Sequence, residues 1–106
     1  RIMDLSGGNG SDPVETIKGF RTPEHANGFA RRYVRDSVER CRAPGMSADE
    51  VIAAWFAFGE DAEVLGGDGG WRSGPELRAF AARPVRDGEE RNWRALDPRR
   101  HGEDAA

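Results

Sequence analysis

The segment 46–61 constrains the fold of this chain more than any other part of the sequence. Ser47 and Glu50 have the spacing of a capping box, in which the side chain of each residue accepts a hydrogen bond from the backbone amide of the other. Met46 and Val51 lie where a hydrophobic staple would join the chain before the cap to the first helical turn. Together these signals predict a helix that begins directly after Ser47.

This predicted helix, residues 48–59, is rich in aromatic side chains and ends abruptly. Trp55, Phe56 and Phe58 place large apolar side chains on more than one side of it. Aromatic side chains beyond what a small core can cover are typical of an interface. Gly59 ends the predicted helix, since glycine often follows the last helical turn, and two carboxylates come after it. The alternative is a helix that continues to Leu65.

A longer helix is predicted before it, over residues 23–42. Thr22 caps the open amides, and Pro23 suits the first turn because its missing N–H is not needed there. Small and apolar side chains then recur every three or four residues over about five turns. This stripe consists of Ala26, Phe29, Ala30, Tyr33, Val34, Ser37, Val38 and Cys41. Gly28 costs a helix about 1 kcal/mol relative to alanine, so we expect it to allow close approach of another element.

The two helices are separated by a short Ala-Pro-Gly link, so we expect an antiparallel helical hairpin. A short third helix is predicted after Ser73, and Pro84 ends it. Short strands are predicted near residues 2–5, 14–20 and 62–65. The predicted fold is therefore α+β, with the helices packed on a small sheet of about three strands. The alternative is a mainly α fold in which the first twenty residues form an irregular arm.

The length of 106 residues fits one compact domain, which we expect over residues 1–96, with residues 97–106 as a disordered tail. Cys41 is the single cysteine, which excludes an intrachain disulfide and a cysteine zinc cluster. No apolar run is long enough to span a bilayer, and no secretory leader pattern opens the sequence. We therefore expect a cytoplasmic protein that does not enter membranes.

Basic charge comes from 15 arginines and one lysine, which with the abundant alanine and glycine is typical of a G+C-rich bacterial genome. This bias weakens functional interpretations of the arginines. Charge is unevenly distributed: residues 47–70 hold six acidic residues and no basic one, whereas residues 21–46 carry a net charge of +3. An acidic block beside a basic one predicts contacts within the fold or between subunits.

Few residues are candidates for catalysis. Glu60 and Asp61 follow the aromatic helix, and carboxylates beside apolar surface can have raised pKa values that suit acid–base work. We favour the simpler interpretation that they form the polar exit of a helix. His25, Arg35 and Arg72 are weak candidates for binding an anion. We expect no metal and no cofactor, because the two histidines are far apart and no calcium-loop order of acids is present.

The arginines over residues 31–42 could form a basic helix face for nucleic acid. Asp36 and Glu39 interrupt this face. Both residues, like Arg35, are predicted to lie outside the apolar stripe of the helix. The second helix of the predicted hairpin is acidic and aromatic, unlike a helix that contacts DNA bases. We therefore do not expect nucleic-acid binding.

The sequence combines strong folding signals with no convergent catalytic set. We predict a non-enzymatic interaction or regulatory module that forms a homodimer, or binds a protein partner, through its aromatic helix. The predicted interface consists of Trp55, Phe56, Phe58 and Trp71. The alternative is an enzyme or small-ligand-binding protein with an acidic pocket at Glu60 and Asp61.

Overall fold

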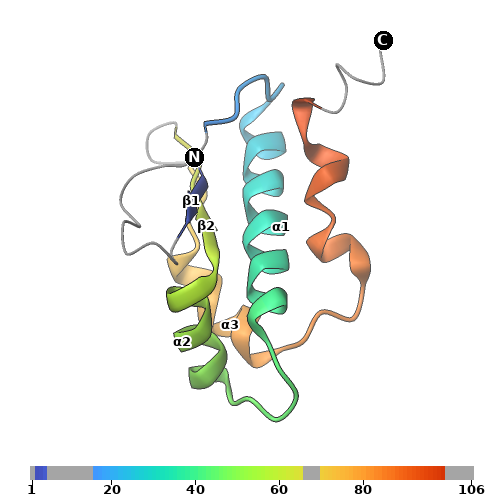
Figure 1. Ribbon diagram of the computed structural model, residues 1–106. Coiled ribbons are helices and arrows are strands. Elements are labelled where there is room, and N and C mark those ends of the chain that lie inside the picture. The colour runs from blue at the N-terminus through green and yellow to red at the C-terminus, as the bar shows by residue number, and fades with distance from the viewer. Residues whose placement is uncertain (1, 5–15, 66–69, 100–106) are drawn as a thin grey trace.

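The computed structural model describes residues 2–4, 16–65 and 70–99. In chain order they form strand β1 (Ile2–Asp4), helix α1 (Pro23–Cys41), helix α2 (Ala48–Phe58), strand β2 (Glu60–Ala62), helix α3 (Gly74–Ala82) and the short 3₁₀ helices η2 (Gly88–Arg91) and η3 (Trp93–Leu96). Figure 1 shows α1 in the centre, with the strands, α2 and α3 on one side and η2 and η3 on the other.

α1 begins at the predicted cap. The hydroxyl oxygen of Thr22 accepts a 3.0 Å hydrogen bond from the amide of His25, and Pro23 occupies the first turn. The expected close approach at Gly28 is confirmed, because a Cβ placed there would lie only 3.2 Å from Cδ1 of Leu96 in η3. The buried residues of α1 are Phe29, Ala30, Val34, Arg35, Asp36, Ser37 and Val38. Two charged residues predicted to lie outside the apolar stripe are therefore buried.

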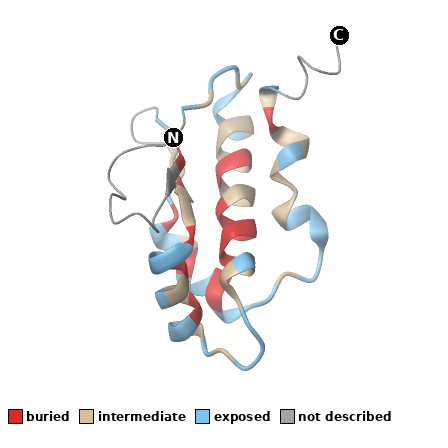
Figure 2. Cartoon of the chain, in the orientation of Figure 1, coloured by how far each residue is buried: buried red, intermediate tan, exposed pale blue. Residues whose placement is uncertain are grey.

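The predicted capping box of α2 is confirmed. The amide of Ser47 donates to Oε1 of Glu50 at 3.1 Å, and the amide of Glu50 donates to Oγ of Ser47 at 3.2 Å. α2 ends at Phe58, so the alternative of a helix extending to Leu65 is wrong. Figure 2 shows that the side of α2 turned away from α1 is largely exposed.

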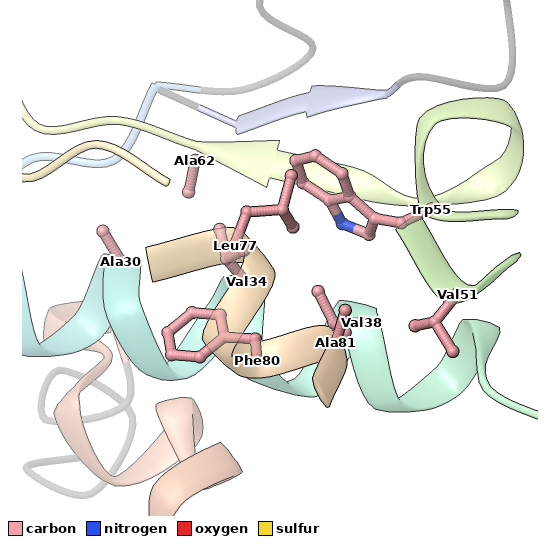
Figure 3. Close-up of a cluster of buried hydrophobic side chains, with 9 residues drawn as sticks. All are labelled: Ala30, Val34, Val38, Val51, Trp55, Ala62, Leu77, Phe80 and Ala81. Carbon is pink, nitrogen blue, oxygen red and sulfur yellow. The ribbon is translucent and has the colours of Figure 1, made fainter. Parts of the chain in front are cut away.

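The core lies where α1, α2, α3 and β2 meet (Figure 3). It consists of Ala30, Val34, Val38, Val51, Trp55, Ala62, Leu77, Phe80 and Ala81. Trp55 is its largest fully buried side chain, and its indole N–H donates to the carbonyl of Glu60 at 3.2 Å. Burial of each large apolar side chain contributes about 1.5–3 kcal/mol, so this cluster holds the three helices together.

The predicted α+β fold with a sheet of about three strands is wrong, and the mainly α alternative fits. Among the described residues the sheet has two strands, in which β1 and β2 pair antiparallel with Ile2 opposite Ala62. Each strand has three residues, and a ladder this short depends on the helices beneath it for stability.

The strand predicted over residues 14–20 is absent from its described part, residues 16–20, which have no regular secondary structure. Gly19 has a φ of 100°, which turns the chain in a conformation that favours glycine. The ring of Phe20 packs at 5.1 Å from His25 and 5.3 Å from Phe29, on the start of α1. Phe20, whose ring is typical of strands, is therefore used in local packing on a helix, since strand propensity depends strongly on context.

Residues 84–99 return along α1 on the side opposite the core (Figure 1). They include Asp97, the first residue of the predicted disordered tail 97–106. The side chain of Asp97 is buried and forms an ion pair with Arg99 at 2.9 Å, so the start of the predicted tail is ordered. The remainder of the predicted tail, residues 100–106, lies outside the described residues.

Candidate functional site

The four aromatic residues predicted to form an interface have different environments. Phe56 and Phe58 are 57% and 75% exposed, whereas Trp55 is 1% exposed and belongs to the core. Trp71 is half-buried and packs against the core. The uncharged exposed part of the helix, which we call the α2 surface, consists of Ala53, Phe56, Ala57 and Phe58; Asp49 and Glu50 in the first turn are also exposed.

Trp71 is held by hydrogen bonds to two helices. Its indole N–H donates to Oε2 of Glu76 at 2.6 Å, and its amide donates to Oδ1 of Asn27 at 3.1 Å. Arg31 donates to the same Glu76 carboxylate at 2.9 Å. Although burial alone would raise the pKa of Glu76, the hydrogen bonds from Trp71 and Arg31 outweigh it and lower that pKa. These contacts fix Trp71 as part of the scaffold.

Glu60 and Asp61 do not share a site. Oε2 of Glu60 accepts a 2.8 Å hydrogen bond from the hydroxyl of Tyr33, beside a space of only about 20 Å³. The carboxylate of Asp61 accepts hydrogen bonds from the amide of Ala62 and from Ser73. Burial raises the pKa of Asp61 in spite of these bonds. Successive strand residues point to opposite faces, so the predicted acidic pocket is replaced by two separate contacts.

The three candidates for anion binding also lie apart. Nε2 of His25 lies 2.7 Å from the carbonyl oxygen of Leu96, so this ring ties the start of α1 to the end of η3. Arg72 is exposed and forms an ion pair with Glu63, between β2 and α3. Arg35 lies on the middle of α1 against α3, and the structure therefore does not bring these side chains to one place.

Arg35 is only 6% exposed, and its contacts are with other parts of the protein. Its guanidinium lies 4.8 Å from the centre of the Phe80 ring, and Nη2 donates to the carbonyl of Arg83 at 2.7 Å. Burial lowers the pKa of Arg35, against the opposing effect of Glu39 and Glu90. Nη1 is buried without a hydrogen-bond partner in the described part of the chain. The residue joins α3 to α1 and presents no charge to solvent.

Three further arginines on or directly after α1 also have protein partners. Arg32 donates to the carbonyl of Asn92, Arg40 pairs with Asp36, and Arg42 donates to the carbonyls of Phe80 and Ala81. Arg32 and Arg42 of the basic block thus hold the η2–η3 segment and α3 on α1.

A cavity of about 620 Å³ lies between residues 16–23, the first turns of α1, and the strands. Its walls include Phe20, Phe29 and Val64, with Lys18 and Arg21 on the segment that precedes α1. No pattern in the sequence predicts this cavity. Its walls come from segments that lie far apart in the sequence, so no local pattern marks it.

No three His, Cys, Asp or Glu side chains within residues 2–4, 16–65 and 70–99 are grouped as a metal site would require. In the same ranges, no helix has both the length and the apolar character needed to cross a membrane. Comparison of the chain with protein-family models, with curated protein sequences and with solved structures finds no match.

Proposed function

We propose that the protein is a non-enzymatic cytoplasmic interaction module that forms a homodimer through the α2 surface. The observation that carries this proposal is the exposure of Phe56 and Phe58, 57% and 75%, on a chain whose other described aromatic side chains are at least half-buried. The single thiol, Cys41, supports a reducing compartment.

Burial of these rings would supply much of the free energy of association. Each fully buried Phe side chain contributes about 1.5–3 kcal/mol, and aromatic side chains are enriched among the residues that dominate interfaces. Ala53 and Ala57 lie one helical turn apart beside Phe56 and are both exposed. Small side chains at these positions favour close approach of a second helix.

A second copy of the chain fits this surface better than a charged partner. α2 carries no basic residue, and Asp49 at its start already pairs with Arg78 of α3 at 2.9 Å. The α2 surface itself is uncharged, and the exposed carboxylate of Glu50 beside it accepts a hydrogen bond from the amide of Ser47. Two copies related by a two-fold axis would therefore bring uncharged residues together. Two antiparallel α2 helices would also align their dipoles favourably.

Analytical ultracentrifugation over a range of concentrations tests the proposal. We expect a monomer–dimer equilibrium, and we expect Phe58→Ser to weaken dimerisation more than tenfold, because a two-fold interface loses the ring twice. Leu65→Ser is the matched control, since Leu65 is 58% exposed but lies beyond β2. We expect this control to dimerise like the wild type.

Circular dichroism of each variant verifies that the fold is retained. A wild-type chain that remains monomeric at every concentration would refute the proposal. Equal weakening by Phe58→Ser and Leu65→Ser would also refute it, because the loss would then not depend on the α2 surface.

A further inference from the structure

The cavity between residues 16–23, α1 and the strands has the size of a small-molecule site. Its volume of about 620 Å³ falls within the range of roughly 300–1,000 Å³ that is typical of ligand pockets. None of its described walls comes from α2. It is therefore separate from the surface through which we propose that the protein dimerises.

The inner walls of the cavity are apolar and continuous with the core. Phe29, Ala30 and Ala62 all line it and are buried residues. Ile17 and Phe20 line it from the segment before α1, and the Phe20 ring lies 5.3 Å from that of Phe29. These side chains offer no hydrogen bonds, so the part of a ligand that they contact must be apolar.

The described walls of the cavity carry two cationic side chains and one carboxylate. Lys18 and Arg21 line it, and neither side chain forms an ion pair or hydrogen bond with any residue that the structure describes. Gly19, with its φ of 100°, sets the turn between Lys18 and Phe20. Glu63 also lines the cavity, but it forms an ion pair with Arg72. Among the walls that the structure describes, the two cations are therefore the charges left to meet a ligand.

We infer that this cavity binds a small amphipathic anion, an aliphatic chain that ends in a carboxylate. The chain would lie against Phe29 and the other apolar walls, and the carboxylate would meet Lys18 and Arg21. Hydrogen bonds between ionised partners are about twice as strong as neutral ones. The apolar walls then supply most of the affinity, and the two cations supply the preference for an anion.

Isothermal titration calorimetry with octanoate, octan-1-ol and octylammonium tests the preference for charge. We expect wild-type protein to bind octanoate about tenfold more tightly than octan-1-ol, and octylammonium most weakly. The double variant Lys18→Gln/Arg21→Gln should bind octanoate and octan-1-ol equally. Arg83→Gln/Arg86→Gln removes the same charge from exposed residues outside the cavity and should keep the tenfold preference.

A second pair of variants tests the location. Ala26 lines the cavity, so Ala26→Phe should fill it and weaken binding of octanoate more than tenfold. Ala79→Phe places the same ring at an exposed position of α3 and should leave binding unchanged. In the wild-type protein, nuclear Overhauser contacts between octanoate methylenes and the rings of Phe20 and Phe29 test the location without any substitution.

The inference is overturned if wild-type protein does not bind octanoate at millimolar concentration, or binds octanoate and octan-1-ol equally. It is also overturned if Lys18→Gln/Arg21→Gln keeps the preference, or if no Overhauser contact reaches Phe20 or Phe29. Phe58→Ser should bind octanoate as the wild type does, so failure of the proposed dimer leaves this test intact.

Discussion

Asp36 on α1 accepts a 2.6 Å hydrogen bond from Nε of Arg91, a residue 55 positions later in the chain. The other carboxylate oxygen of Asp36 accepts a 3.2 Å hydrogen bond from the indole N–H of Trp93 and pairs with Arg40 at 3.1 Å. The Asp36 side chain is only 10% exposed. One carboxylate thus anchors both η2 and η3 to α1.

The first prediction concerns this anchor. Asp36→Asn removes the negative charge and leaves Arg91 and Trp93 with a weaker acceptor, so we expect a loss of about 2–3 kcal/mol in the free energy of unfolding. Urea denaturation measures this loss. The control is Asp49→Asn, whose exposed pair with Arg78 is expected to contribute less than about 1 kcal/mol. Equal losses in the two variants would contradict the assignment of Asp36 as the anchor.

The second prediction concerns Gly59, at the end of α2. Its φ is −87°, so the backbone does not require glycine, but a Cβ there would lie 2.3 Å from Cδ1 of Trp55. The buried ring would have to move, and we expect Gly59→Ala to cost about 1–3 kcal/mol. Chemical denaturation measures the cost, and near-ultraviolet circular dichroism reports the displaced indole. Gly74→Ala is the control, because nothing lies within 4 Å of its Cβ and it should be close to neutral.

The third prediction uses the pH dependence of Asp61. Burial raises the pKa of this carboxyl above its ordinary value of 3.8, so the folded protein loses stability as pH rises from 3.8 through the raised value. Asp61→Asn removes this loss and keeps an oxygen to accept from Ala62. We therefore expect the variant to be more stable than wild type at pH 7 and to lose that advantage below pH 3.8. Lower stability of Asp61→Asn at pH 7 would mean that the carboxylate is a net stabilising group.

The fourth prediction has the opposite pH dependence. The pKa of Glu76 is lowered from 4.5, because the hydrogen bonds from Trp71 and Arg31 outweigh burial. The stability that this carboxylate contributes is therefore present above pH 4.5 and is lost as pH falls through the lowered value. We expect Glu76→Gln to cost about 1 kcal/mol at pH 7, with the difference from wild type vanishing in acid. If the loss of stability in Glu76→Gln does not change with pH, the cause would be altered packing and not the missing negative charge.

The two long helices could be predicted closely because their signals are local. The predictions of 23–42 and 48–59 differ by one residue at each C-terminus from Pro23–Cys41 and Ala48–Phe58. A capping side chain bonds an amide two or three residues away, so neighbouring residues carry the information. The strand predicted over 14–20 was wrong in its described part because strand formation needs a partner chain, which no local pattern supplies.

The candidate site depended on contacts that a single sequence does not display. Apolar patterning marked α2 as aromatic but did not separate Trp55, which enters the core, from the exposed Phe56 and Phe58. Arg35 and Asp36 were expected outside the buried stripe, yet both are buried, because α3 covers one and residues 88–96 cover the other. The cavity was missed since it lies between segments that are distant in the chain.

The sequence by itself determined where α1 and α2 begin and end, because capping and helical periodicity act over a few neighbouring residues. Only the tertiary structure decided which aromatic rings stay exposed, which arginines form hydrogen bonds and ion pairs within the protein, and where the cavity lies. These features depend on the return of residues 84–99 along α1 and on the pairing of β1 with β2. The free energy that stabilises this arrangement comes from burial and pairing between residues that are distant in the sequence and that only folding brings together.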